Sequence, residues 1–162
     1  TNLEVIHMSM IGQYITVEDS VLQQIIHGDK DIYDIIFKPC INIEKSWDAI
    51  HYILCKDRFY GKAPMKYIVP KDNVIDCDLD YGASYITVEQ VKEASDFLNS
   101  LDDNTLKEMY DFKALQRNKV YPLTDLDKED DFYEYIYFYL MILKKYFAET
   151  AQQGKAIIFF IW

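Results

Sequence analysis

The stretch DDFYEYIYFYLMILKKYFAETAQQGKAIIFFIW, residues 130–162, contains the two clearest structural signals of the chain. Its first part repeats apolar residues at helical spacing and is followed by Gly154, which is typical of a helix end, so we expect a long helix over about 130–152. Its last part, 155–161, is apolar at almost every position. This second pattern predicts an interior strand with both faces covered.

Two earlier segments, 10–17 and 81–86, also have the β-branched and aromatic content of strands. Between the expected strands, apolar residues recur at helical spacing, most clearly over 43–55 and in the segment that follows Thr87, where Thr87 and Gln90 form a capping box. The loop over 56–80 is expected to contain a short strand at 65–69. Because strands and helices do not alternate regularly, we predict an α+β fold: a small, mainly antiparallel or mixed sheet covered by several helices, including the long C-terminal one.

Length and composition favour one globular domain. The chain has 162 residues, 50% of them hydrophobic, with only five Gly and four Pro, which excludes disordered and collagen-like classes. Residues 1–7 are interpreted as a cloning remnant in front of a native start at Met8, so the single domain is expected to span 8–162.

The charge and cysteine content exclude several functions. Seventeen Lys and Arg stand against twenty-seven Asp and Glu, a net charge of −10, which argues against nucleic acid as a partner. Three cysteines without Cys-x-x-Cys spacing favour neither a disulfide framework nor a zinc site, and no apolar run approaches the roughly 20 residues of a membrane helix. We therefore expect a cytoplasmic protein without membrane contact. No cofactor is expected, because phosphate-binding Gly loops and hydrolase motifs are absent.

One helix contains residues that are suited to acid/base chemistry. Trp47, Asp48 and His51 fall on one side of the helix expected over 43–55, and Tyr14 is assigned to the same pocket. Asp48 would orient the imidazole of His51 and set its proton affinity. The structural alternative, which we favour, is that Trp47 and His51 pack in the core while Asp48 satisfies the ring N–H.

A second acidic motif is Asp76-x-Asp78-x-Asp80, which resembles the start of a calcium loop. The remainder of the loop does not fit, because Tyr81 stands where glycine is required and Thr87 where a bidentate glutamate is required. We therefore expect a solvated acidic loop and assign no metal site, and a looser divalent-cation site is the alternative.

The beginning of the long helix is rich in carboxylates and tyrosines. The helix dipole explains one or two of the acidic residues, whereas the surplus indicates either a solvated face or a patch that attracts a basic protein. Tyrosine is enriched in protein interfaces, so two tyrosines are added to the predicted protein-binding face. This face comprises Asp125, Asp127, Glu129, Asp130, Asp131, Glu134, Tyr133 and Tyr137.

The aromatic residues of this helix are too many for one face. Either the helix is central and buried all round, which is the favoured interpretation, or its tyrosine surface contacts another chain. Both a monomer and a homodimer remain open.

Several stretches together resemble the YfbM-like family of bacterial proteins, a domain of unknown function. They are MIGQY at 10–14, IEKSWDAIHY at 43–52, YG at 81–82 and VYP at 120–122. The most specific element is Trp47-Asp48-x-x-His51, and the segment 56–80 matches poorly. The resemblance implies a compact bacterial cytosolic α+β domain, and the family supplies no catalytic residues.

Two functions follow as hypotheses. The first is a non-catalytic protein-binding module whose acidic, tyrosine-rich face recognises a basic partner, by analogy an immunity-type inhibitor of a basic toxin or nuclease. The alternative is a small enzyme with Asp48 and His51 as weak candidate catalytic residues in the pocket with Tyr14 and Trp47.

Overall fold

The computed structural model describes residues 10–39 and 41–162, which form one five-stranded antiparallel sheet and the helices around it. The strand order is β2-β1-β5-β4-β3, and every neighbouring pair is antiparallel. This confirms the α+β expectation and the three predicted strands, and it adds two short edge strands. The strands are β1 (Gly12–Val17), β2 (Ile41–Asn42), β3 (Val74–Ile75), β4 (Ala83–Ile86) and β5 (Ala156–Ile161).

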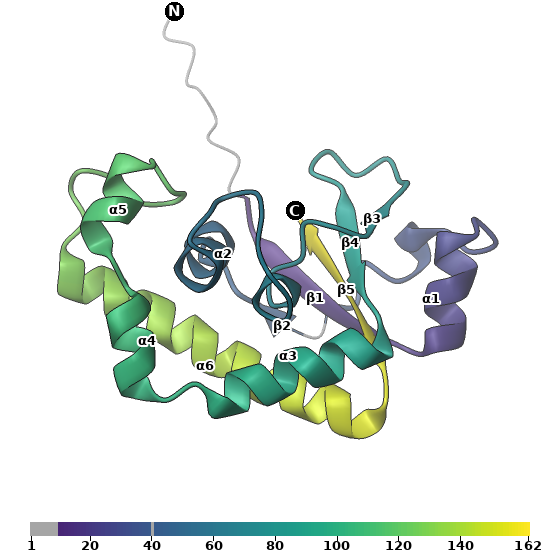
Figure 1. Cartoon of the computed structure of the whole chain (residues 1–162). Helices are drawn as coiled ribbons and strands as arrows, with labels where there is room; N and C mark the ends of the chain where they lie inside the picture. The colour runs from purple at the N-terminus through teal and green to yellow at the C-terminus, as the bar shows by residue number, and fades with distance from the viewer. Residues whose placement is uncertain (1–9, 40) are drawn as a thin grey trace, which may run out of the picture.

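The last strand of the chain occupies the centre of the sheet. β5 pairs with β1 from Gly12↔Ile161 to Val17↔Ala156 and with β4 from Ala83↔Phe160 to Ile86↔Ile157. Beyond the strand ends, Ile11 and Trp162 exchange two backbone hydrogen bonds of 2.9 Å. Figure 1 shows β5 between β1 and β4. It also shows the long helix α6 that leads into β5.

Helices form in the regions that the apolar spacing predicted, but the helix expected over 43–55 begins only at Trp47, because 43–46 forms a turn in which the Ser46 hydroxyl donates to the carbonyl oxygen of Ile43. The capping box of Thr87 and Gln90 is present at the start of α3. Asp102 and Asp111 cap the next two helices by accepting hydrogen bonds from Thr105 N and Ala114 N. The helices are α1 (Asp19–Ile26), α2 (Trp47–Cys55), α3 (Val88–Ser100), α4 (Asp103–Met109), α5 (Phe112–Arg117) and α6 (Glu129–Gln153), with short 3-10 helices η1 (Ile32–Asp34) and η2 (Met65–Tyr67).

The sheet divides the interior into two apolar clusters. The larger one lies between one face of the sheet and α2, α3 and α6, and its β5 contributions are Ile157 and Phe159. The smaller one lies on the opposite face beneath α1 and η1, where β5 contributes Ile158 and Phe160. Figure 1 shows these helices on the two sides of the sheet. The alternation along β5 explains why this strand is apolar at every position.

Helix α6 is buried along one stripe rather than all round. Its stripe includes Phe132, Ile136, Leu140 and Phe147, whereas Phe138 is exposed. The four tyrosines in the first half of α6 are half-buried and pack at the margin of the larger cluster. The surplus aromatic residues therefore cover the rim of the core.

The expectation of a strand at 65–69 is wrong. Met65–Tyr67 is a 3-10 helix, and the following Ile68 and Val69 are fully buried against the larger cluster. Pro64 and Pro70 flank the segment and lack the N–H groups that a strand would use in a ladder. Among the described helices, none combines the length and apolar character that a bilayer crossing requires.

Two leucines test this core assignment. Leu140 on α6 is 1% exposed, whereas Leu126, in the loop before α6, is 91% exposed. We expect Leu140→Ala to lower the free energy of unfolding by about 2–5 kcal/mol, and Leu126→Ala to change it by less than about 0.5 kcal/mol. Urea denaturation of both variants measures the difference, and equal losses would contradict the assignment.

Candidate functional site

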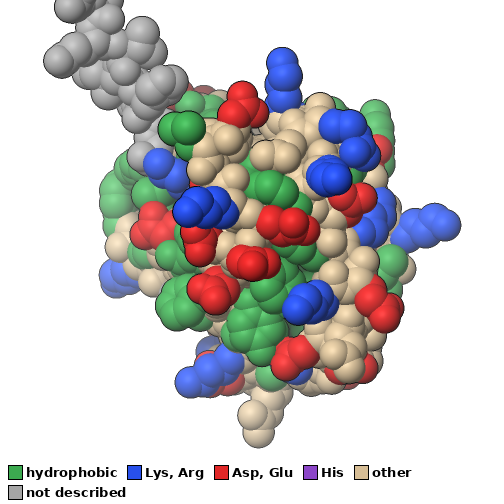
Figure 2. Space-filling model, turned by 90° about the vertical axis from the view of Figure 1, so that its left-hand side faces the viewer, with side chains coloured by type: hydrophobic (Ala, Val, Ile, Leu, Met, Phe, Trp, Pro, Cys, Tyr) green, Lys and Arg blue, Asp and Glu red, His purple; other side chains and the backbone are tan. Residues whose placement is uncertain are grey.

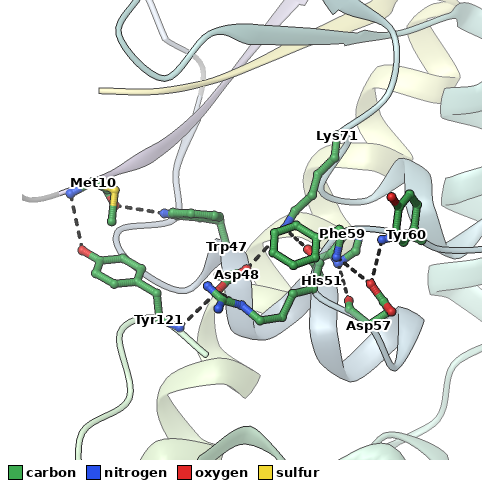
Figure 3. Close-up of polar contacts among 10 residues, drawn as sticks. Met10, Trp47, Asp48, His51, Asp57, Phe59, Tyr60, Lys71 and Tyr121 are labelled. Atoms are coloured by element: carbon green, nitrogen blue, oxygen red, sulfur yellow. Dashed lines mark hydrogen bonds and ion pairs between the residues drawn. The ribbon is translucent and has the colours of Figure 1, made fainter. Parts of the chain in front are cut away.

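A buried carboxylate on α2 links three segments of the chain. Asp48 is 1% exposed, and its Oδ2 accepts hydrogen bonds from Arg58 Nη2 at 2.9 Å and from the backbone N–H of Tyr121 at 3.0 Å. Its Oδ1 accepts a hydrogen bond from Lys71 Nζ at 3.2 Å. Figure 3 shows these contacts converging on one side chain. The carboxylate is thus saturated by donors, as a buried charge requires.

Aromatic rings surround the two cations that pair with Asp48. Lys71 Nζ lies 5.8 Å from the ring centre of Trp47 and 5.7 Å from that of Phe59. The indole N–H of Trp47 donates to the carbonyl oxygen of Met10 at 3.0 Å, and the Trp47 ring packs against that of Tyr121 (Figure 3). Cation–π contacts of this kind add to the ion pairs. The cluster therefore fixes Lys71 firmly in place.

His51 lies one turn after Asp48 and has a separate partner. Its Nδ1–H donates to the carbonyl oxygen of Asp57 at 2.9 Å, and the side chain of Asp57 in turn accepts hydrogen bonds from the N–H groups of Phe59 and Tyr60 (Figure 3). Burial, assisted by the charge of Lys71, lowers the pKa of His51 to about 4. The imidazole is therefore neutral at pH 7.

The structure separates the members of the predicted acid/base pocket. Tyr14 is 0% exposed and donates its hydroxyl hydrogen to the carbonyl oxygen of Ile68, deep in the larger cluster. Asp48 and His51 are also buried, and their hydrogen bonds go to different partners. Trp47 does line a cavity, of about 270 Å³. Tyr14, Asp48 and His51 do not line that cavity, and their burial and hydrogen bonds favour structural roles.

The acidic and tyrosine-rich face contains a groove of about 400 Å³ at the start of α6. Figure 2 views the molecule from this side and shows carboxylates, interspersed with Lys and Arg side chains, around a hydrophobic patch. Four of the predicted protein-binding residues line the groove, together with Lys107 and Tyr110 of the α4 region, which the sequence analysis did not include. The four are Glu129, Asp130, Tyr133 and Glu134.

Hydrogen bonds hold two tyrosines of this face: Tyr110, which lines the groove, and Tyr137, which lies outside it. The Tyr110 hydroxyl donates to the carbonyl oxygen of Glu129 at 2.8 Å, and that of Tyr137 donates to Asp103 Oδ1 at 3.0 Å. The rings of Tyr110, Tyr133 and Tyr137 pack in series. Burial, together with the charges of Glu129 and Asp130, raises the pKa of Tyr110. Tyr110 and Tyr137 are thus held by hydrogen bonds, and the ring of Tyr133 packs between theirs.

The other predicted members of this face do not line the groove. Asp127 accepts hydrogen bonds from both the N–H and the hydroxyl of Thr124, so it helps to shape the loop before α6. Asp125 and Asp131 are exposed, and Asp131 lies in the first turn of α6, where the helix dipole favours a carboxylate. The sequence analysis did not predict Lys107, Tyr110 and Asp103 as part of this face. They lie next to α6 only in the folded protein, and no local sequence pattern shows this.

The Asp76, Asp78 and Asp80 motif lies on the loop between β3 and β4. Asp78 and Asp80 line one hollow, whereas Asp76 lines only a neighbouring one. Over residues 10–39 and 41–162, no three side chains of His, Cys, Asp or Glu are grouped so as to hold a metal ion.

The Asp48 network generates a stability prediction. Asp48→Asn leaves Arg58 and Lys71 without their buried counter-charge, and we expect it to lower the free energy of unfolding by about 3 kcal/mol. Asp72→Asn removes the exposed partner of Lys66 and should cost less than about 1 kcal/mol. Denaturant unfolding of both variants measures this contrast. A loss at Asp48 as small as that at Asp72 would show that the network contributes little.

His51 generates a pH prediction. Its pKa is lower in the folded protein than the usual 6.5, so the unfolded chain binds more protons between pH 6.5 and 4. The stability from neutral His51 is complete above pH 6.5, and about 3 kcal/mol of it is lost by pH 4.

Urea unfolding between pH 7 and 4 measures this loss. His51→Asn keeps an N–H donor for the carbonyl oxygen of Asp57 and should flatten the profile, whereas His27→Asn, on an exposed residue, should leave it as in the wild type. An unchanged slope in His51→Asn would refute the assignment.

Comparisons with known proteins agree with the architecture. The chain is 23% identical over 131 residues to protein YfbM of Escherichia coli (strain K12). The aligned region covers 75% of this chain and 78% of that protein. The crystal structure of YfbM from Escherichia coli, titled a protein of unknown function, matches 94% of this chain and 100% of its own with a TM-score of 0.78 at 21% identity. At this identity the structural match shows a shared fold.

A family model covers almost the whole chain. The model described as domain of unknown function DUF1877 matches residues 8–160. This match and the likeness to YfbM confirm the resemblance that was inferred from the sequence motifs. The chain belongs to the DUF1877 family.

Proposed function

We propose that this protein is a non-catalytic binding module that recognises a basic protein through the groove at the start of α6. The observation that carries the proposal is the combination of fixed tyrosine rings and unpaired carboxylates around one depression. Aromatic side chains held in place lose little entropy on binding, and carboxylates accelerate association with a positively charged partner. An immunity-type inhibitor of a basic toxin or nuclease would use such a surface.

Charge arrangement on this face supports a partner rather than simple solvation. Within the described part of the chain, Glu129, Asp130 and Glu134 form no ion pair, although Lys107 lines the same groove. Two apolar side chains are also exposed: Leu126, in the loop before α6, and Phe138, in the first half of α6. Carboxylates around apolar and aromatic groups match the charge and contact chemistry of a basic protein surface.

The alternative of a small enzyme has weaker support. Asp48 is occupied by Arg58, Lys71 and Tyr121, and His51 is buried with a lowered pKa. A general base must reach the proton that it removes and be poised near the working pH. Neither side chain meets both conditions.

Partner capture with charge variants tests the proposed function. The wild type immobilised at low salt should retain a basic protein from lysate of its source cells, and that protein should be released at high salt. The triple variant Glu129→Gln, Asp130→Asn and Glu134→Gln should bind the purified partner at least about tenfold more weakly and with less salt dependence.

A matched triple variant on α3 provides the control. Glu89→Gln, Glu93→Gln and Asp96→Asn remove three exposed carboxylates away from the groove and should leave the affinity within about twofold. Equal weakening by both triple variants would show that only overall charge matters. Unchanged binding by the groove variant would exclude this surface.

A further inference from the structure

A second hollow, of about 600 Å³, lies at the end of the sheet where β5 stops. Its walls come from the start of β1, from η1, from the loop before β4 and from the C-terminal end of β5. In Figure 1 that loop projects beyond the end of β5 and away from α4 and the start of α6. The hollow shares no lining residue with the groove of the proposed binding function.

Three aromatic rings form its walls. Tyr33 is 38% exposed, and Tyr81 and Trp162 are each 48% exposed, so three accessible rings lie together around one hollow. The Trp162 ring makes an edge contact with Phe37 at 5.6 Å between centres. Its backbone is fixed by two hydrogen bonds with Ile11. The backbone hydrogen bonds and the contact with Phe37 thus place the half-exposed indole at the hollow.

Two carboxylates accompany these rings. Asp78 and Asp80 line the hollow and are exposed, and neither makes an ion pair within the residues that the structure describes. Their loop is closed by a hydrogen bond from the N–H of Gly82 to the carbonyl oxygen of Leu79 at 2.9 Å. Gly82 has a φ of +70°, which disfavours any other residue there. The carboxylates are thus presented from a turn with a defined shape.

We propose that this hollow binds a small organic cation, an alkylammonium or alkylguanidinium group with an apolar chain. Aromatic faces attract such cations, and a carboxylate beside the rings supplies the opposite charge. The volume falls within the range of small-molecule pockets, about 300–1,000 Å³. Ile161 and Leu79 supply apolar wall for the chain of the ligand. This site is independent of the protein-binding groove.

Trp162 supplies a direct reporter of binding. The chain has two tryptophans, so an ¹⁵N-labelled sample gives two indole N–H signals, and Trp162→Phe identifies the one from the hollow. We expect butylguanidinium and butylammonium, at constant ionic strength, to shift the Trp162 signal saturably. The Trp47 indole, which is hydrogen-bonded to Met10, should stay in place. Neutral 1-butanol and KCl should leave both signals unchanged.

Charge variants in the same loop locate the site. Asp80→Asn should weaken binding of butylguanidinium about fivefold, whereas Asp76→Asn removes an equal charge from outside this hollow and should change it less than twofold. Tyr81→Leu should weaken it by a similar factor by removing one aromatic face.

Four results would overturn the proposal: no shift at Trp162, binding of 1-butanol as tight as that of the cations, equal weakening by the two loop variants, or undiminished binding by Tyr81→Leu. A blocked tripeptide with a central arginine that binds more tightly than butylguanidinium would also overturn it, in favour of a peptide ligand.

Discussion

The position of β5 constrains the rest of the structure. A strand with hydrogen-bonded neighbours on both sides and apolar residues on both faces must be covered from two directions. The chain meets this requirement with α2, α3 and α6 on one face and with α1 and η1 on the other. β5 is the last strand in sequence and pairs with β1, the first. The sheet therefore forms only when residues 156–161 meet residues 12–17. The fold therefore depends on contacts that are distant in sequence.

Asp48 has a comparable role among the polar residues. It connects α2 to the segment that carries Arg58 and Lys71 and to the backbone at Tyr121, and none of these segments belongs to the sheet. Burying a carboxylate costs desolvation free energy. Asp48 can therefore connect α2 to the other two segments only because each of them supplies a donor. The hydrogen bonds and ion pairs of Asp48 and His51 thus account for their presence in this helix motif without invoking catalysis.

Periodicity predicted most of the fold. The strands at 10–17, 81–86 and 155–161, the long C-terminal helix and the capping box at Thr87 all follow from local patterns, and the structure confirms them. The segment 65–69 was misread because apolar residues between two prolines match a short strand as well as a buried turn. The two-residue strands β2 and β3 are too short to produce a pattern.

The sites depended on tertiary neighbours that no local pattern reveals. Arg58 and Lys71 reach Asp48 across loops, and Tyr110 contacts the start of α6 from the residue that follows α4.

The net charge of −10 is distributed in a way that the composition cannot show. Several carboxylates serve the fold by accepting backbone N–H groups, and they no longer need an external partner to explain them. They are Asp31, Asp48, Asp57, Asp102, Asp111 and Asp127. Other carboxylates gather at two hollows, each beside exposed or half-buried aromatic rings. At the start of α6 the rings also cover the rim of the core, so the feature that the fold leaves unexplained is the placement, beside aromatic walls at both hollows, of carboxylates that form no ion pair within the described residues.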